Sequence, residues 1–296
     1  LIEELQGRGI AEESDGAMVV RFPDDQQLAD KPAIVRKRDG AANYTTTDLA
    51  TLQYRMETWK PSDIVYVTDG RQQLHFQQLF KIFGRWQNAT SVQLEHVWFG
   101  SILGPDGKPF KTRSGDTVRL ADLLDEAEER AFAVVSEKNP GLLESERREI
   151  ARVVGLGALK YADLSNNRQS DYIFDWDKML ALQGNTAPYL QYAYTRVRSI
   201  FRKMDAPNFD NVELQFKAPE ELTLAKHLMN FGQALEMVAQ NYRPNFLCNY
   251  LFELAGHFSR FYEACPVLKA EASEQNSRLA LCELTACVLR SGLDAL

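Results

Sequence analysis

Two kinds of hydrophobic spacing divide the chain. Up to about residue 115, short β-branched runs alternate with turns, whereas from about Leu120 onward apolar residues recur every three or four positions. The first pattern is typical of strands and the second of amphipathic helices. The change in spacing predicts an α/β part followed by an all-α part.

The chain opens with a predicted hairpin and a helix. Segments 16–22 and 32–40 have the composition of strands, and the second ends in the turn signal Asp39-Gly40. Residues 48–59 place Leu49, Leu52 and Met56 on one helical face. Thr47 is the expected N-cap of this helix, which stops before Pro61.

A βαβ unit follows. The apolar run Ile64 to Val67 predicts a strand over 63–70 that is buried on both faces, as in parallel sheets. A helix over 71–86 and a strand-like stretch over 92–103 complete the unit. This crossover predicts a parallel, doubly wound sheet with a ligand crevice at the carboxyl ends of its strands.

The second part is predicted to be a helix bundle. Two long amphipathic helices begin at about Val118 and are separated by Asn139-Pro140-Gly141, and a short extended piece with a turn follows at 172–180. Pro, Asn and Asp enrich the linkers between the remaining helices. Those helices are expected at 186–203, 218–241, 245–263 and 272–291.

Composition places the chain among soluble globular proteins. Its 296 residues include 34 Lys and Arg against 41 Asp and Glu, a net charge of −7, and 45% are hydrophobic, which excludes a disordered or collagen-like chain. Apolar runs stay short of the ~20 residues of a membrane span, and the N-terminus lacks a signal-peptide pattern, so an intracellular, cytoplasmic protein without a membrane partner is expected. The negative charge argues against indiscriminate nucleic-acid binding, although a local basic stripe can still hold RNA.

Common catalytic and metal-binding motifs are missing from the sequence. The four cysteines include no CxxC pair and the four histidines are scattered, so reduced packing thiols and no structural metal are expected. GPDGKP at 104–109 lacks the spacing of a phosphate-binding P-loop, and no GxSxG elbow is present. GLGALK at 155–160 lies within a helical period, where its glycines favour close helix packing.

A basic, glycine-containing loop is the first candidate site. Lys108, Lys111 and Arg113 lie within six residues, directly after a strand expected to end at the crevice. Cations on such a loop can close over a polyphosphate and stabilise charge on a transferring phosphorus centre. The alternative is a solvated basic hairpin.

The second candidate combines residues near the starts of two helices. Tyr44, Asp48, Gln72 and His75 fall where sites form in parallel α/β folds. A carboxylate, a phenol and an amide together suit a group with several donors, such as a guanidinium. The alternative is that Asp48 merely favours a helix N-terminus and that Gln72 faces solvent.

The third candidate is the helix over 186–203. Tyr192, Arg196 and Lys203 recur near one face, with Tyr189 one turn earlier. Interleaved aromatic and basic side chains can stack on bases and hold phosphates. A solvated basic face with core tyrosines explains the same pattern.

Five stretches in one order resemble a known family. They are DGAANYTTTDLA, DIVYVTDGRQQLHF, LEHVWFGSILGPDGKPFKTRSGDTVRLADLLDEA, NTAPYLQYAYTRVRSIFRK and YLFELAGHFSRFYEACPVL. Together they resemble bacterial-type arginyl-tRNA synthetases, which are class I aminoacyl-tRNA synthetases. The resemblance implies the C-terminal half of a Rossmann-type catalytic domain followed by a helical anticodon-binding bundle.

The resemblance also implies roles for individual residues. PFKTRSG would occupy the place of the class I KMSKS loop, with Thr112 at the second lysine position, so Lys111 and Arg113 are the candidate catalytic cations. Tyr44, Asp48 and Gln72 would bind the arginine guanidinium. The residues implied for ATP are His75, His96, Val97 and Lys108, and those implied for tRNA are Tyr189, Gln191, Tyr192, Arg196 and Tyr250.

One departure from the family concerns the HIGH sequence, because none of the four histidines lies in an HxGH context. We therefore expect a fragment in which 1–117 is the second half of the catalytic domain, 118–185 the connecting stem and 186–296 the anticodon-binding bundle. The implied reaction joins L-arginine to tRNA(Arg) through arginyl-adenylate, with ATP and its Mg²⁺ as substrate, in a monomer. A non-catalytic tRNA-binding fragment or paralogue that uses only the bundle, and a class I synthetase for another amino acid, stay open.

Overall fold

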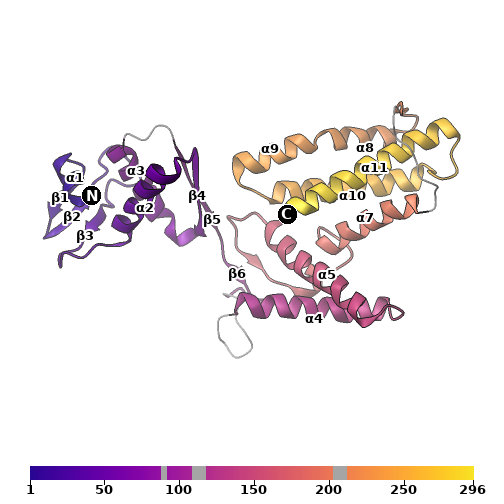
Figure 1. The fold of residues 1–296 in the computed structure, drawn as a ribbon, viewed down its shortest axis with the longest axis horizontal. Helices are drawn as coiled ribbons and strands as arrows, with labels where there is room; N and C mark the ends of the chain where they lie inside the picture. The colour runs from indigo at the N-terminus through magenta and orange to yellow at the C-terminus, as the bar shows by residue number, and fades with distance from the viewer. Residues whose placement is uncertain (88–91, 109–117, 203–211) are drawn as a thin grey trace. The chain divides into compact units, whose positions relative to one another are not determined.

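The computed structural model describes residues 1–87, 92–108, 118–202 and 212–296. These residues form two compact units, Leu1–Gly100 and Ser101–Leu296, which are shown in Figure 1 and described one at a time below. Within the described ranges, no helix combines the length and the apolar character that crossing a membrane requires.

A small antiparallel sheet opens the first unit, after the short helix α1 (Ile2–Gly7). Its strands, in the order β1-β2-β3, are β1 (Glu12–Ser14), β2 (Ala17–Val20) and β3 (Ala33–Arg36). Asp15 and Gly16 join β1 to β2 with φ of 51° and 76°, the left-handed pair that a tight hairpin turn requires. The predicted turn at Asp39-Gly40 is confirmed, because Gly40 has φ of 82° and its N–H donates to the Lys37 carbonyl at 3.0 Å.

Helix α2 (Tyr44–Trp59) begins earlier than predicted. Its N-cap is Asn43, whose side-chain oxygen accepts the Thr46 N–H at 3.3 Å and whose side-chain nitrogen donates to the Ile34 carbonyl on β3. Thr47 instead lies inside the first turn and donates its hydroxyl to the Tyr44 carbonyl at 2.9 Å. The prediction of Thr47 as N-cap is wrong because Asn43 caps the helix and fastens it to the sheet at the same time.

The predicted βαβ unit is confirmed. Strand β4 (Asp63–Asp69) leads through a 3-10 turn, η1 (Gly70–Gln72), into α3 (Gln73–Gln87), and the chain returns as β5 (Gln93–Phe99). The two strands are parallel over their whole length, with Asp63 opposite Gln93 and Asp69 opposite Phe99. Because both strands run the same way, their carboxyl ends, at Asp69 and Phe99, lie at one edge of the sheet.

Helix α3 covers one face of this sheet, whereas the other face is open along β4. Ile64 is buried with Phe76 of α3, and the Tyr66 ring lies 4.7 Å from the Phe76 ring. On the opposite face, Val65 is 41% and Val67 64% exposed. The prediction that residues 63–70 are buried on both faces is wrong for this chain, because the apolar run meets a helix on only one face among the described residues.

The single strand predicted over 92–103 is two strands in the structure. After β5 ends at Phe99, the chain passes Gly100 and forms β6 (Ile102–Leu103) in the second unit. This strand pairs in parallel with β7 (Tyr172–Ile173), a partner some 70 residues later that no local pattern indicates. Asp171 fastens the same contact by accepting the Ser101 N–H at 2.6 Å.

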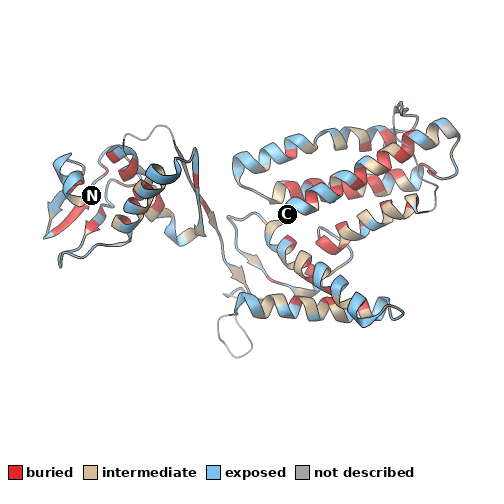
Figure 2. Ribbon diagram, in the orientation of Figure 1, coloured by how far each residue is buried: buried red, intermediate tan, exposed pale blue. Residues whose placement is uncertain are grey.

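Helices make up most of the second unit. They are α4 (Leu120–Lys138), α5 (Glu144–Leu164), α6 (Trp176–Met179), α7 (Ala187–Phe201), α8 (Pro219–Met229), α9 (Phe231–Asn241), α10 (Asn245–Ala264) and α11 (Ala272–Ala295). The single helix expected over 218–241 is two helices, which meet at Asn230. Figure 2 shows the buried positions along α10 and the adjoining helices, where Leu251, Leu254 and Phe258 are at most 1% exposed.

The four cysteines all lie in this bundle and are free. Cys248, Cys265 and Cys282 are buried in its core, where burial raises the pKa of the Cys248 thiol to about 12. Cys287 is exposed on α11 instead. The expected packing role therefore holds for three of the four thiols.

Close packing of α4 on α5 depends on Gly155, as the sequence predicts. A Cβ at this position would lie 2.5 Å from the Ala127 carbonyl oxygen, a backbone atom that cannot move aside. At Gly157, two residues further along α5 and on a different face, a Cβ would meet only the side-chain amide of Gln191, at 3.1 Å.

Gly155→Ala is therefore expected to destabilise the second unit by about 1 to 3 kcal/mol, since overpacking outweighs the ~1 kcal/mol gain in helix propensity. Gly157→Ala, which makes the same gain in the same helix, is the matched control and should change stability by less. Urea unfolding of both variants measures the difference. Equal stability of the two variants would show that the backbone contact at Ala127 does not limit packing.

Candidate active site and RNA-binding residues

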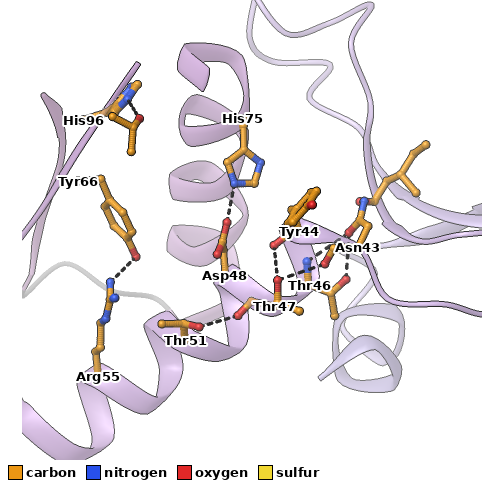
Figure 3. Close-up of polar contacts among 12 residues, drawn as sticks. Asn43, Tyr44, Thr46, Thr47, Asp48, Thr51, Arg55, Tyr66, His75 and His96 are labelled. Atoms are coloured by element: carbon orange, nitrogen blue, oxygen red, sulfur yellow. Dashed lines mark hydrogen bonds and ion pairs between the residues drawn. The ribbon is translucent and has the colours of Figure 1, made fainter. Parts of the chain in front are cut away.

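Asp48 and His75 meet between two helices. Asp48 lies one turn after Tyr44 on α2, and His75 lies in the first turn of α3. Figure 3 shows the contact between the two side chains. The His75 Nε2 is 2.7 Å from the Asp48 Oδ2, and the side chains are 24% and 36% exposed. Because a carboxylate only accepts hydrogen bonds, Nε2 is the donor in this pair. The contact holds one carboxylate oxygen and leaves Oδ1 to accept from a ligand.

Tyr44 and Gln72 lie near this pair in the chain and are exposed. Tyr44 is the first residue of α2 and is 85% exposed, and Gln72 ends η1, three residues before His75. The structure brings Asp48 and His75 into contact, whereas it joins neither Tyr44 nor Gln72 to them directly. A carboxylate oxygen, a phenol and an amide on adjoining helix starts can together accept the several N–H groups of a guanidinium.

Arg55 lies on the same face of α2 as Asp48 and contacts Tyr66 on β4, and neither residue is among the predicted site residues. The Arg55 Nη1 donates to the Tyr66 hydroxyl at 3.0 Å, and the guanidinium lies 5.3 Å from that ring. Burial raises the pKa of Tyr66, while the neighbouring Arg55 charge opposes the rise. The spacing of Asp48, Leu52 and Arg55 places them on one face of α2, a signal that could have found Arg55 but not its partner on β4.

His96 and Val97 lie on opposite faces of β5, since successive side chains of a strand alternate. The His96 Nε2 is 2.8 Å from the Thr68 hydroxyl, and its ring stacks on Phe76 with centroids 4.4 Å apart. Val97 is 8% exposed. A shallow cavity of about 240 Å³ borders the His96 side of the strand, and its lining residues are Gln73, Gln77, Phe80, Leu94, Glu95, His96 and Trp98.

Only one of the three loop cations lies within the described residues. Lys108 is exposed in a turn where its N–H donates to Asp106 at 3.1 Å and its carbonyl accepts the Gly104 N–H at 2.7 Å. Gly107 adopts φ of 70° in this turn. Lys111 and Arg113 lie outside the described residues. Among the residues that are described, no three His, Cys, Asp or Glu side chains form a group that could hold a metal ion.

The candidate RNA-binding residues of α7 differ in exposure. Tyr192 is 55% exposed, while the Tyr189 ring packs 5.6 Å from Phe252. The Arg196 guanidinium lies 4.9 Å from the Tyr262 ring and is partly exposed. Gln191 faces α5, and its side-chain oxygen is buried without a hydrogen-bond partner among the described residues. Tyr192 and Arg196 are thus the best placed to meet a ligand.

Tyr250 is a packing residue. It is 7% exposed, its ring stacks on His227 at 4.5 Å and 9°, and its hydroxyl donates to the His227 carbonyl at 3.0 Å. This burial leaves little of the ring for a base, and the tRNA contact implied for Tyr250 stays a prediction. The cause of the burial is its position on α10, where helical spacing groups it with the core residues Leu247, Leu251 and Leu254.

Two known protein families match the chain. Residues 1–176 match the sequence model described as tRNA synthetases class I (R), catalytic domain, in which R is the one-letter code for arginine. The chain belongs to the class I arginyl-tRNA synthetase family. Residues 190–296 match the DALR anticodon binding domain, so both parts expected of an arginyl-tRNA synthetase are present in one order.

Arginyl-tRNA synthetases named as such match the whole chain. Arginine--tRNA ligase of Chromobacterium violaceum is 52% identical over 300 residues, and that of Klebsiella pneumoniae is 49% identical over 302 residues. All of this chain is covered in both matches, but only 52% of each relative. The chain therefore spans about half the length of the curated relatives it matches.

Solved arginyl-tRNA synthetases share the fold. The crystal structure from Plasmodium falciparum matches 99% of this chain and 50% of its own, with a TM-score of 0.85 and 28% identity. The Thermus thermophilus structure matches 99% of this chain and 57% of its own, with a TM-score of 0.83 and 25% identity. These matches confirm the predicted fold class, a class I catalytic part followed by a helical anticodon-binding domain.

Proposed function

We propose that this chain supplies the arginine-binding and tRNA-binding half of an enzyme that joins L-arginine to tRNA(Arg) through arginyl-adenylate. The observation that supports it best is the Asp48 carboxylate, one oxygen of which accepts from His75. Tyr44 lies one turn earlier on α2, and Gln72 lies three residues before His75. The family assignment adds the reaction class, because the relatives are named as arginine--tRNA ligases.

In this proposal Asp48 neutralises the substrate guanidinium. Its Oδ1 accepts an N–H of arginine, the Tyr44 hydroxyl and the Gln72 carbonyl oxygen accept others, and His75 orients the carboxylate. The positions implied for ATP are His75, His96, Val97 and Lys108, with Lys111 and Arg113 as the catalytic cations at the phosphates. Mg²⁺ arrives with ATP as part of that substrate.

The three expected segments become parts of the same proposal. Residues 1–117 complete the catalytic nucleotide fold, 118–185 form the stem, and 186–296 bind the anticodon arm. The protein acts as a monomer in the cytoplasm. Tyr192 and Arg196 make the main contacts of α7 with tRNA, and Tyr189 and Gln191 support them. Below, the two-half protein means this chain joined to the upstream half that its relatives carry.

Arg196→Ala is expected to weaken binding of tRNA(Arg) and to reduce the slope of log affinity against log salt by roughly 0.7 to 0.9, the value of one phosphate contact. Arg198→Ala on the same helix is the matched control, because the Arg198 charge is already paired with Glu283 at 2.7 Å. Titration of the 296-residue chain at two salt concentrations measures both slopes. Equal affinity for cognate and anticodon-swapped tRNA would contradict anticodon recognition by this part.

A further inference from the structure

Two side-chain contacts join one face of α2 to different elements. Asp48 accepts from His75 of α3 at 2.7 Å, and Arg55 donates to the Tyr66 hydroxyl of β4 at 3.0 Å, and Figure 3 shows both contacts. Seven residues separate Asp48 from Arg55, which is about 10 Å along the helix axis. The two side chains, both among the described residues, form no ion pair with each other. Arg55 therefore bonds Tyr66 without occupying the carboxylate that a guanidinium needs.

Tyr66 contacts both of the helices that carry the site. Its hydroxyl accepts from Arg55 of α2, and its ring lies 4.7 Å from the ring of Phe76 on α3. Phe76 is 4% exposed, directly follows His75 in the chain and meets the His75 ring edge-on at 5.2 Å. One side chain of β4 thus holds α2 through its hydroxyl and α3 through its ring. The spacing between Asp48 and His75 depends on how these two helices are held.

The charges of α2 act on the Tyr66 phenol from both sides of its titration. Burial raises the pKa of Tyr66, the Arg55 charge opposes that rise, and the Asp48 charge adds to it. Both charged groups therefore lie within electrostatic reach of the hydroxyl. The Arg55 guanidinium also lies 5.3 Å from the Tyr66 ring, whose face attracts a cation. Arg55 is thus held at β4 by a hydrogen bond and by the aromatic ring together.

The two halves of α2 are fastened differently. At its start, the Asn43 side-chain nitrogen and the Thr46 hydroxyl donate to carbonyls of β3. In the second half, from Leu52 to Trp59, the bond from Arg55 to Tyr66 is the one side-chain hydrogen bond to another element among the described residues. Without this bond, the second half of α2 can tilt away from β4 while its start stays on β3. Such a tilt moves the Asp48 carboxylate relative to α3.

We propose that the Arg55–Tyr66 contact positions the arginine site, because it holds α2 so that the Asp48 carboxylate keeps its contact with His75 and its second oxygen stays in place for the substrate. The proposal rests on the proposed function, since it takes arginine as the ligand of Asp48. Arg55 and Tyr66 are positioning residues and bind no substrate themselves. Because hydrogen bonds weaken steeply as distance and angle change, a small shift of Asp48 lowers arginine affinity and leaves ATP binding alone.

The test removes the hydrogen bond from each end in the two-half protein. Tyr66→Phe deletes the hydroxyl and keeps the ring that packs on Phe76, and Arg55→Met deletes the donor and keeps most of the apolar stem. Tyr54→Phe is the matched control, because it deletes the hydroxyl of a tyrosine that lies on the same helix and is 58% exposed. Steady-state kinetics with arginine and ATP varied in turn are measured for each variant, after thermal unfolding has confirmed that it is folded.

Tyr66→Phe and Arg55→Met should each raise the KM for arginine by roughly 5- to 50-fold, because the bonds from Asp48 to the substrate weaken without being lost. The kcat and the KM for ATP should stay within about twofold, as expected when only substrate binding is affected, and Tyr54→Phe should change none of the three constants. The double variant should have an arginine KM no higher than that of the more affected single variant, since both substitutions remove the same contact.

Asp48→Asn separates the two ways in which the test can fail. An arginine KM that rises in Asp48→Asn but in neither Tyr66→Phe nor Arg55→Met would overturn the positioning role while the proposed function stands. Both KM values rising together would show a general structural role, and additive effects in the double variant would show that the two side chains act separately; either result overturns the proposal. No effect of Asp48→Asn itself would overturn the proposed arginine site, and the positioning role with it.

Discussion

Asp48→Asn in the two-half protein should lower kcat/KM for arginine by about 30- to 5,000-fold and leave the KM for ATP close to its original value. The reason is the charge at this position. A guanidinium that loses a desolvated, hydrogen-bonded carboxylate partner costs about 2 to 5 kcal/mol, most of it from the unpaired charge left behind. Asparagine keeps the size of Asp48 and its contact distance to His75, so the variant isolates the charge.

Glu57→Gln is the matched control for this prediction. Glu57 lies on the same helix, is exposed, and bonds only the Gln53 side chain among the described residues, at 2.9 Å. Steady-state kinetics with arginine and ATP varied in turn should show an effect for Asp48→Asn alone. An arginine KM and kcat that do not change in Asp48→Asn would remove Asp48 from the substrate site.

The 296-residue chain by itself is expected to form no detectable arginyl-adenylate. None of its four histidines lies in an HxGH context, and it spans about half the length of its relatives. Removal of a single preorganised group that stabilises developing charge costs about 10²- to 10³-fold in kcat, and here every such group of the other half is lost together.

Arginine-dependent exchange of pyrophosphate into ATP, in the presence of tRNA, measures adenylate formation. The chain should show background exchange while the two-half protein shows turnover, and tRNA binding by the same preparation of the chain serves as its positive control. Robust charging of tRNA(Arg) by the chain alone would place all the chemistry within these 296 residues and overturn the division of labour proposed for the two halves.

Local spacing was enough to predict the elements that carry the fold. The apolar run at 63–70, the helical period at 71–86 and the next run together specified the βαβ unit, because each pattern depends on neighbouring residues only. The close helix packing at Gly155 was also predictable, since glycine disfavours a helix and is kept within one mainly where a neighbouring backbone comes close.

Features that depend on distant contacts were not predictable in this way. Asn43 and Thr47 are both good N-caps, and the choice falls to Asn43 because it also bonds β3. The exposure of Val65 and Val67 depends on which layers cover the sheet, which a strand's own sequence does not contain. The pairing of β6 with β7 likewise joins segments about 70 residues apart.

The candidate site likewise has features that local spacing predicts and features that depend on distant contacts. Sequence spacing placed Asp48 and His75 near the starts of two helices, but their 2.7 Å contact depends on how α2 packs on α3. Tyr250 shows the opposite case. Its helical spacing with Leu247, Leu251 and Leu254 already indicated the core, and its burial leaves little of the ring for the base contact that the family resemblance implies.

Amino-acid specificity is the most direct test of the account. Pyrophosphate exchange by the two-half protein, with tRNA(Arg) present and each of the twenty amino acids supplied in turn, reports which side chain the site with Asp48 accepts. The account predicts exchange with arginine and only background with the other nineteen. Exchange driven by another amino acid, or none with arginine while tRNA is bound, would contradict it.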